Sequence, residues 1–580
     1  MNTFNWKVAG LSGEGIMVSG LIFSKTSSRH GFYIFDYTEY PSIITGGHNT
    51  YQVHAGIEPV YAQKEKLDLL LAMNANALVE HLDELTSNSL VIFDSSDDKI
   101  NIAEFNLPCK SLDLPMVKLA KEMGATRLMG NNVGLGASAY LLGLDLEILN
   151  SVIHDIFARK GQEVVDLNHK AAKAGYEFAR NAKAAGQLGN WDFAAFEKQE
   201  YPESRVTFTG NEAVALGSVA GGLKLFAAYP MTPSSSVLHY LAAHEDKAGI
   251  VVKHAEDEIS AINMALGASF TGVRSMTSTS GGGFAYMTEA LGLSGVSELP
   301  LVVFESMRPG PALGMPTWTA QGDLQFVVTA SQDEFPRFVF APGDAQEAFE
   351  MAKLSQELAE KYQGLVILLS DKYLSESRYT AELAVTKLSH ERHGFNQNPV
   401  SDETGFYPRY KIDKENAISM RSVPGQQGGE HINNSYEHDE YGLATEESQM
   451  RISQMDKRKR KLKLMKSEIP QQFYSGSLED EITFISFGST KGPLLEAQRQ
   501  LAANGKKVGV LNLTWLSPFP IEQVSKVIKE SKRVVVVEGN QCGQLANLIT
   551  QETGIKLEEN YRRYDGRPFY AEEIIKFINK

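Results

Sequence analysis

Apolar and polar positions along the first third of the chain predict short strands separated by helices. Strand patterns occur at residues 5–11, 31–36, 67–72 and 90–94. A long alanine-rich helix is expected over residues 166–189, and a polar, aperiodic stretch follows it. Because alternating strands and helices are typical of parallel α/β sheets, we expect an α/β domain over residues 1–190 and a linker over residues 191–205.

The same alternation begins again near Val206. Strands are predicted at residues 249–253, 273–277, 301–305 and 365–370. Helices are predicted at residues 211–225 and 258–270, and a glycine-rich loop at residues 280–283 leads into another helix. This pattern predicts a second α/β domain over residues 206–378.

Residues 379–470 are polar and irregular, so we expect an arm or linker there. The run at residues 457–466 has seven basic residues in ten. A nucleic-acid-binding tail could use such a run, but the acidic chain around it favours a solvated helix face.

The alternation returns in the last hundred residues. Strands are predicted at residues 482–487, 507–513 and 533–538, and helices at residues 492–504 and 521–530. We therefore expect a third α/β domain over residues 471–580, and the predicted fold class is α/β with three parallel-sheet domains.

Composition excludes several classes of function. Hydrophobic residues make up 43% of the 580 residues, enough for several cores, and the net charge of -15 argues against nucleic acid or anionic membrane as a partner. No apolar run approaches the roughly 20 residues that span a bilayer, and the first residues lack a signal-peptide pattern, so a soluble cytoplasmic protein is expected. Two cysteines are too few for an iron–sulfur cluster, and the 13 histidines show no metal-site spacing, so we predict no metal ligands.

The glycine-rich turn at residues 10–15, followed by Asp36, has some features of a dinucleotide-binding fingerprint. Val18 interrupts the required glycine spacing, and Glu14 places negative charge where a pyrophosphate would lie. A tight strand-to-helix turn is the favoured interpretation. The chain also lacks the P-loop and the Gly-Asp-Gly diphosphate motif.

Candidate chemistry gathers in the second domain, first in the loop YPMTPSSS at residues 229–236. The loop follows a short apolar strand pattern at residues 225–228, and ligands bind at the carboxyl ends of strands in open α/β sheets. Its hydroxyls therefore face a ligand, or they cap the helix that begins near Val237.

Two charged segments follow at similar positions. Three acids of the segment HAEDE at residues 254–258 suit a helix start, and Glu258 leads a very apolar helix. A partly desolvated carboxyl there would suit proton donation. In the segment ESMRPGP at residues 305–311, Pro309 keeps Arg308 out of helical geometry, so its guanidinium could bind a carboxylate or form a surface salt bridge.

In this order, YPMTPSS at 229–235, EDE at 256–258, TSTSGGG at 277–283 and RPGP at 308–311 resemble the α subunits of 2-oxoacid:ferredoxin oxidoreductases. The sequences GMPTWTAQ at 314–321, GGEHIN at 428–433 and EHDEYG at 437–442 extend the resemblance. The first domain is similar to the γ domain of that family, with SGEG where the family has Gly-Gly-Gln-Gly. The resemblance implies a transketolase-like pyrimidine-binding domain and a transketolase C-terminal-like domain.

The resemblance also implies a cofactor and its placement. Glu258 would pair with a ring nitrogen of the aminopyrimidine of thiamine diphosphate, and a two-residue shift would assign this role to Glu256 instead. Pro230, Ser280 and Gly281 would line the cofactor. The diphosphate, its Mg²⁺ and a [4Fe-4S] cluster would belong to a β subunit.

Substrate contacts are implied for Arg308 and Thr232, with Tyr229 and Ser234 beside them. The implied reaction is oxidative decarboxylation of 2-oxoglutarate with coenzyme A to succinyl-CoA and CO2, with electrons passed to ferredoxin by an (αβ)2 assembly. Pyruvate or broad 2-oxoacid specificity is the alternative substrate class. A non-catalytic assembly subunit and a transketolase-type lyase are the alternatives of other classes.

Overall fold

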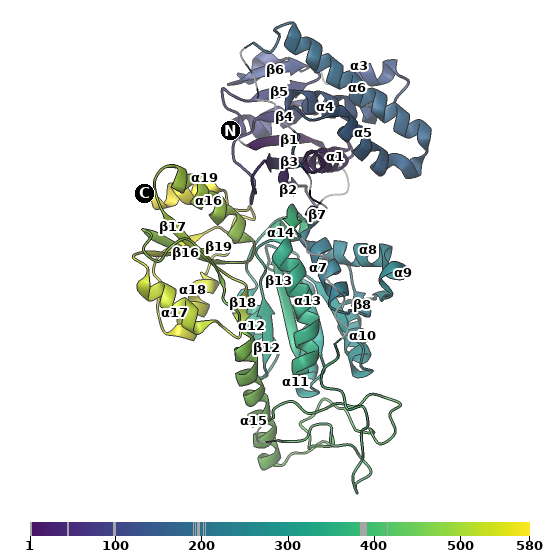
Figure 1. Cartoon of the computed structure of the whole chain (residues 1–580), viewed down its shortest axis with the longest axis vertical. Helices are drawn as coiled ribbons and strands as arrows, with labels where there is room; N and C mark the ends of the chain where they lie inside the picture. The colour runs from purple at the N-terminus through teal and green to yellow at the C-terminus, as the bar shows by residue number, and fades with distance from the viewer. Residues whose placement is uncertain are drawn as a thin grey trace. The chain divides into compact units, whose positions relative to one another are not determined.

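The computed structural model describes residues 3–42, 46–96, 100–189, 191, 193, 198–200, 202, 205–382, 391–413 and 416–580. The chain forms two compact units (Figure 1). The first unit contains the residues up to Phe208 and two later segments that begin at Ser377 and Tyr570. The second unit contains the remaining residues between Thr209 and Phe569.

One mixed sheet organises the first unit, with strand order β6-β5-β4-β1-β3-β2-β14-β7 within the described residues. Its strands are β1 Thr3–Leu11, β2 Tyr33–Glu39, β3 His48–Gly56, β4 Leu69–Ala72, β5 Leu90–Phe93, β6 Lys110–Asp113, β7 Arg205–Thr209 and β14 Arg378–Glu382. Its main helices are α1 Ile16–Arg29, α2 Ala75–His81, α3 Met116–Glu122, α4 Gly130–Leu141, α5 Leu146–Phe157, α6 Gln162–Ala184 and α19 Ala571–Ile578.

The predicted α/β class is confirmed here, but the sheet is not purely parallel. Strands β1, β4, β5 and β6 run parallel, whereas β3 is antiparallel to both β1 and β2. The connection from β2 to β3 is too short for a crossover helix, so β3 folds back beside β2 as a hairpin. Strand β3 then lies between β1 and β2 and explains the antiparallel pairs.

Two glycines allow the helices of the first unit to pack closely. An ideal Cβ on Gly136 of α4 would lie 1.8 Å from the carbonyl oxygen of Ala172, and one on Gly175 of α6 would lie 1.8 Å from that of Val133. Any side chain at either position would collide with the backbone of the neighbouring helix. The long helix predicted over residues 166–189 is present as α6, and the two glycines set its distance from α4.

Hydrogen bonds within the first unit hold the turn that has some features of a dinucleotide-binding fingerprint. Glu14 accepts a hydrogen bond through Oε2 from the Leu11 amide (2.6 Å). Asp36 is buried and accepts hydrogen bonds from the Ser24 and Tyr51 hydroxyls and from the Arg378 amide. Because that carboxylate already binds three donors inside the unit, the arrangement favours the tight-turn interpretation.

Two sheets organise the second unit. The first has strand order β18-β12-β13-β11-β10-β8-β9 and is parallel except for β18. Its strands are β8 Leu225–Ala228, β9 Val251–His254, β10 Ser275–Thr279, β11 Leu301–Met307, β12 Arg337–Phe340, β13 Leu365–Asp371 and β18 Trp515–Ser517. The smaller sheet has order β15-β17-β16-β19-β20, with β15 Phe473–Ser475, β16 Ile482–Phe487, β17 Val508–Leu513, β19 Val534–Glu538 and β20 Asn560–Arg562.

Twelve α-helices are described in this unit, and the sequence pattern predicted some of them. The one predicted at residues 211–225 ends at Ala220 because Leu225 begins β8. The twelve are α7 Gly210–Ala220, α8 Ser235–Ala243, α9 Glu245–Ala248, α10 Glu258–Phe270, α11 Gly281–Val296, α12 Leu324–Thr329, α13 Ala345–Tyr362, α14 Lys372–Glu376, α15 Ser448–Met465, α16 Lys491–Ala503, α17 Ile521–Glu530 and α18 Gln544–Thr553. One hydrophobic cluster contains residues of both sheets, among them Val303 of β11 and Leu511 of β17. None of the described helices is long and apolar enough to cross a membrane.

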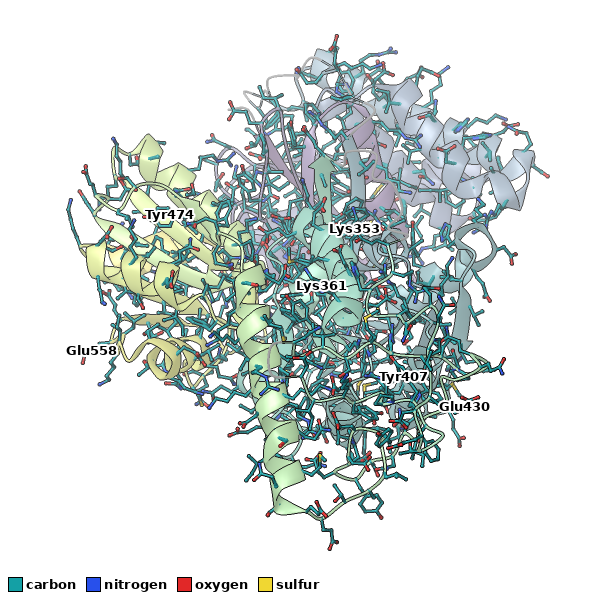
Figure 2. All side chains as sticks on the ribbon, turned by 60° about the horizontal axis from the view of Figure 1, so that its bottom comes forward. Lys353, Lys361, Tyr407, Glu430, Tyr474 and Glu558 are labelled. Atoms are coloured by element: carbon teal, nitrogen blue, oxygen red, sulfur yellow. The ribbon has the colours of Figure 1, made fainter. Side chains whose placement is uncertain are left out.

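The irregular segment after β14 is ordered by backbone contacts and buried ion pairs. Tyr407 and Glu430, labelled in Figure 2, come from this segment, and the Tyr407 amide donates to the Glu430 carbonyl oxygen (2.7 Å). Glu360 of α13 pairs with Arg392 and Arg421 of the segment and with Arg274, which precedes β10.

The basic run at residues 457–466 corrects one prediction. It lies on α15, but Lys457, Arg458 and Lys461 are buried rather than solvated. The Nζ atoms of Lys457 and Lys461 lie 2.6 Å and 2.7 Å from the two carboxylate oxygens of Glu298. The prediction of a solvated face is wrong for these three residues because buried carboxylates, distant in sequence, compensate their charge.

Candidate functional site

The loop after β8 is held in place from both ends. Asn211 of α7 donates through Nδ2 to the Pro233 carbonyl oxygen and to the Ser236 hydroxyl, each at 2.7 Å. The Ser234 hydroxyl donates to the Met231 carbonyl oxygen (2.8 Å), and Ser234 is fully buried. The loop is therefore a preformed feature, and in this structure the Ser234 hydroxyl is used inside it.

Tyr229 and Pro230 occupy the outer part of this loop. Tyr229 is 40% exposed, and its ring centroid lies 6.2 Å from that of His254, the last residue of β9. Pro230 is half-buried. Both residues therefore stand at the carboxyl ends of two neighbouring parallel strands, the edge at which ligands bind in such sheets.

Arg308 joins this loop to the end of β11. Its Nη1 donates to the carbonyl oxygen of Thr232 (2.6 Å), and the residue is buried. Among the described residues Arg308 forms no ion pair, although Asp323 lies near enough for the two charges to interact. A buried cation of this kind suits an incoming carboxylate.

Glu258 lies at the first position of α10 and is buried, whereas Glu256 is exposed. Asp257 provides the cap of the helix, because its side chain accepts from the Ser260 amide (2.7 Å) and the Ser260 hydroxyl caps the Asp257 amide in return. The capping function predicted for the acidic cluster thus belongs to Asp257. Because Asp257 caps the helix, the Glu258 carboxyl is free to point inward.

Three consecutive glycines at the start of α11 bring the site together. An ideal Cβ on Gly283 would lie 2.6 Å from Glu258 Oε1, and one on Gly281 would lie 2.4 Å from Asp323 Oδ2. One on Gly282 would lie 3.2 Å from Met231 Cε, and the Met231 sulfur accepts from the Gly283 amide. Side chains from three separate segments therefore approach the positive end of α11 only because this end has no side chains of its own.

Ser280 precedes these glycines and is fully buried. Its hydroxyl has no hydrogen-bond partner among the described residues. A buried, unpaired hydroxyl is uncommon in native proteins, and it fits a position at which a bound molecule supplies the partner.

Two acids beside Arg308 were not singled out in the sequence. Glu305 of β11 is fully buried, and neither carboxyl oxygen has a hydrogen-bond partner among the described residues. Burial, with the charges of Asp323 and Asp371, holds the pKa of Glu305 well above its usual range. Burial raises the pKa of Asp323 to about 6, although Arg308 opposes the rise. A usable signal existed for Glu305, since it is the one acid in the mostly apolar strand β11.

The structure thus brings Thr232, Glu258, Gly281 and Arg308 together around the start of α11. Within the described part of the chain, no group of three or more His, Cys, Asp or Glu side chains is arranged to hold a metal ion. The arrangement offers a buried carboxyl, a guanidinium without an ion pair and unpaired buried polar atoms at one sheet edge. It suits an uncharged or cationic ring beside Glu258 and an anion beside Arg308.

Three protein-family models match the chain in succession. "Pyruvate ferredoxin/flavodoxin oxidoreductase" matches residues 5–178, and "Pyruvate flavodoxin/ferredoxin oxidoreductase, thiamine diP-bdg" matches residues 216–457. "Pyruvate:ferredoxin oxidoreductase core domain II" matches residues 480–574. The second of these matches contains every candidate site residue that lies after α7.

Individual relatives extend over the whole chain. The α subunit of 2-oxoacid:ferredoxin oxidoreductase 2 from Aeropyrum pernix is 31% identical over 99% of this chain and 97% of its own length. The 2-oxoglutarate oxidoreductase subunit KorA of Mycobacterium tuberculosis is 29% identical over 99% and 90%. The structure of 2-oxoglutarate:ferredoxin oxidoreductase from Magnetococcus marinus with 2-oxoglutarate, coenzyme A and succinyl-CoA bound is 32% identical, with a TM-score of 0.91 over 100% of this chain and 99% of that one.

Proposed function

We propose that this chain, which belongs to the 2-oxoacid:ferredoxin oxidoreductase family as an α subunit, acts in the oxidative decarboxylation of 2-oxoglutarate. The products would be succinyl-CoA, CO2, a proton and two electrons for ferredoxin, and coenzyme A would be consumed. The observation that carries the proposal is the meeting of Glu258, Arg308 and the Thr232 loop at the glycine start of α11. The names of the Magnetococcus marinus and Mycobacterium tuberculosis relatives support 2-oxoglutarate as substrate. The Aeropyrum pernix relative is named for 2-oxoacids in general, so broad specificity, pyruvate included, is the second candidate.

The site fits the aminopyrimidine of thiamine diphosphate. A buried carboxyl at Glu258 and an unpaired hydroxyl at Ser280 offer hydrogen-bonding partners to a flat, polar ring. Pro230 and Gly281 would line that ring without adding charge. When bound, thiamine diphosphate supplies a carbon nucleophile for the oxo carbon and an electron sink for the departure of CO2.

Each residue of this chain would have a defined task. The Glu258 carboxyl would hold a proton at a ring nitrogen of the aminopyrimidine, and its burial would keep that hydrogen bond strong. Arg308 would bind the substrate carboxylate, since the Thr232 carbonyl oxygen fixes one end of its guanidinium and leaves the other donors free. The hydroxyl of Thr232 would orient the oxo group, and Tyr229 would stand beside it. Ser234, assigned to the substrate by the sequence, would instead hold the loop from within, because it is fully buried and its hydroxyl donates to a carbonyl oxygen of the same loop.

We also propose that a β subunit completes this site. Large apolar side chains are exposed on the elements that carry it, which are Tyr229, Ile259, Met264, Tyr286, Leu313, Met315 and Phe326. An exposed apolar surface of this extent is typical of a protein interface. The β subunit would supply the diphosphate contacts, Mg²⁺ and the [4Fe-4S] cluster, because the two cysteines of this chain are too few for a cluster.

The remaining assignments rest on the same family membership. We assign residues 1–190 to a γ domain, residues 206–378 to the pyrimidine-binding domain and residues 471–580 to a transketolase C-terminal-like domain. An (αβ)2 assembly in the cytoplasm that reduces ferredoxin agrees with these assignments.

The test is an anaerobic assay of the chain co-expressed with its β subunit. Reduction of methyl viologen would be followed with coenzyme A and either 2-oxoglutarate or pyruvate. Glu258→Gln should lower kcat by at least about 100-fold, the usual contribution of a positioned proton-transfer group. Glu256→Gln is the matched control, because this exposed acid lies two residues away and should leave turnover unchanged.

Other outcomes distinguish the alternatives. Turnover of pyruvate as fast as 2-oxoglutarate would establish broad specificity. A cluster-loaded complex that turns over no 2-oxoacid would reject the enzymatic proposal in favour of an assembly subunit. Decarboxylation without viologen reduction would indicate a transketolase-type lyase.

A further inference from the structure

Two acids lie close enough to Arg308 for their charge to act on its guanidinium. Glu305 lies three residues earlier on the same strand, and Asp323 precedes α12. The charged form of either carboxyl would act on the Arg308 guanidinium, yet neither forms an ion pair with it within the described residues. The guanidinium is therefore held by the Thr232 carbonyl oxygen rather than by a carboxylate.

Asp323 is the acid placed to influence a bound anion. Its Oδ2 lies against Gly281, where even a Cβ would be only 2.4 Å away, so the carboxyl group stands at the glycine start of α11. Its side chain has no hydrogen-bond partner among the described residues. The first residues of α11 are the same ones that Glu258 and Met231 approach, so Asp323 belongs to the rim of the same site.

Glu305 differs from Asp323 in its environment. It is completely buried, and its side chain emerges on the face of β11 that also carries Val303 and Met307 of the hydrophobic cluster. A carboxyl with no hydrogen-bond partner in such surroundings is neutral. Glu305 therefore leaves the positive charge of Arg308 uncompensated, and Asp323 is the acid whose charge can vary.

The other charged groups around Asp323 are few. Strand β11 contributes Arg308 and Glu305, and Asp371 of β13 acts on Glu305 rather than on Asp323. Helix α10 contributes Glu258, which lies against Gly283. Helix α18 contacts the segment through the neutral Gln544, and α11 begins with glycines. Among the described residues, Arg308 is thus the one cation whose charge lowers the pKa of Asp323.

We propose that Asp323 is a positioning residue for the substrate, whose negative charge opposes the binding of a carboxylate at Arg308. The inference rests on the proposed function, since it assumes that Arg308 receives the carboxylate of a 2-oxoacid. Two anions beside one guanidinium repel each other, so the substrate binds more tightly when Asp323 is neutral. By linkage, substrate binding favours the protonated form of Asp323.

A pH dependence follows from this linkage. Burial raises the pKa of Asp323 to about 6, so the group is mostly ionised at pH 8 and mostly neutral below pH 6. Each unit by which the bound anion raises this pKa corresponds to about a tenfold weaker binding when Asp323 is ionised. In the wild type, the repulsion is present above pH 6 and disappears as the pH falls through the pKa.

The experiment compares Asp323→Asn with wild type in the complete complex between pH 5.5 and pH 8. Asparagine has the shape of the neutral acid, and no hydrogen bond of the native side chain is lost. The ratio of kcat/KM for 2-oxoglutarate, variant over wild type, should be near one at pH 5.5 and rise to about three- to tenfold at pH 8. Because both proteins are measured at the same pH, the ratio removes the effect of every ionisation that they share. The gain should appear in KM with kcat little changed.

Glu350→Gln is the matched control, because it removes one exposed negative charge on α13, the helix that packs against α7. Its ratio should stay flat with pH. For Asp323→Asn, a kcat/KM ratio that stays flat with pH, or a KM that rises at pH 8, would overturn the inference. The proposed function would stand in either case as long as the wild type turns over 2-oxoglutarate. Absence of wild-type turnover of any 2-oxoacid would overturn both.

Discussion

Gly283→Ala tests whether the glycine start of α11 is what allows Glu258 to reach the site. The added Cβ would lie 2.1 Å from Thr279 Oγ1, 2.6 Å from Glu258 Oε1 and 2.7 Å from Glu258 Cγ. Ordinary contacts to a methyl group are about 3.5–4.0 Å, so the Glu258 side chain must move by about 1 Å. Helical backbone would not be strained, since Gly283 has a helical conformation inside α11.

The expected result is a large loss of activity with a small loss of stability. Overpacking a buried position costs about 1–3 kcal/mol, and the better helix propensity of alanine offsets about 1 kcal/mol of it. A displacement of about 1 Å in a catalytic group can lower the rate by about 100-fold. The αβ complex should therefore remain folded and lose most of its viologen-reducing activity.

The assay pairs this variant with Gly364→Ala. Gly364 immediately precedes β13, at the opposite end of the sheet, and the nearest atom to its added Cβ is 3.8 Å away. Both variants should unfold within a few degrees of the wild type, and only Gly283→Ala should lose turnover. Full activity in a folded Gly283→Ala complex would refute the assignment of Glu258 to the site.

Two further predictions concern stability. Glu298→Gln should destabilise the second unit by about 3–5 kcal/mol, because Lys457 and Lys461 would keep buried charges without a partner. Urea unfolding should then show a clearly lower midpoint. Wild-type-like unfolding would show that these lysines become neutral at little cost. His48 has its pKa lowered to about 4 by burial and by the charge of His81, so the unfolded chain binds this proton more readily. Stability of the first unit should fall as pH decreases from about 6.5 to 4, and His48→Gln should reduce that slope.

The sequence predicted most strands and helices because their apolar positions repeat with the period of each element. Strands β10, β11 and β13 lie within two residues of their predicted ranges. Strand β3, with the sequence HNTYQVHAG, escaped prediction because polar side chains occupy positions that are buried in the sheet. That strand and β14, which pairs antiparallel with β2, make the sheet of the first unit mixed.

The candidate site was predictable where a motif carries its chemistry locally. Thr232, Glu258 and Arg308 each end or follow a strand, and parallel strands bring such positions to one edge. Asp323 could not be predicted this way, because its proposed role depends on its proximity to Gly281 and Arg308, which arises only when the chain folds. Nothing in the local sequence distinguishes it from an ordinary acid that precedes a short helix.

The same reasoning explains why the burial of some charged residues could not be predicted from the sequence. Lys457 pairs with a carboxylate 159 positions earlier, so its burial depends on a contact that no local pattern reveals. Arg308 shows the opposite case, in which a buried cation has no carboxylate partner and an amide carbonyl oxygen holds it instead. Burying a charge is costly unless a partner compensates it, so a buried cation left unpaired indicates a partner that arrives with the ligand. The difference between these two residues therefore separates a charge that stabilises the fold from one that is available for a substrate.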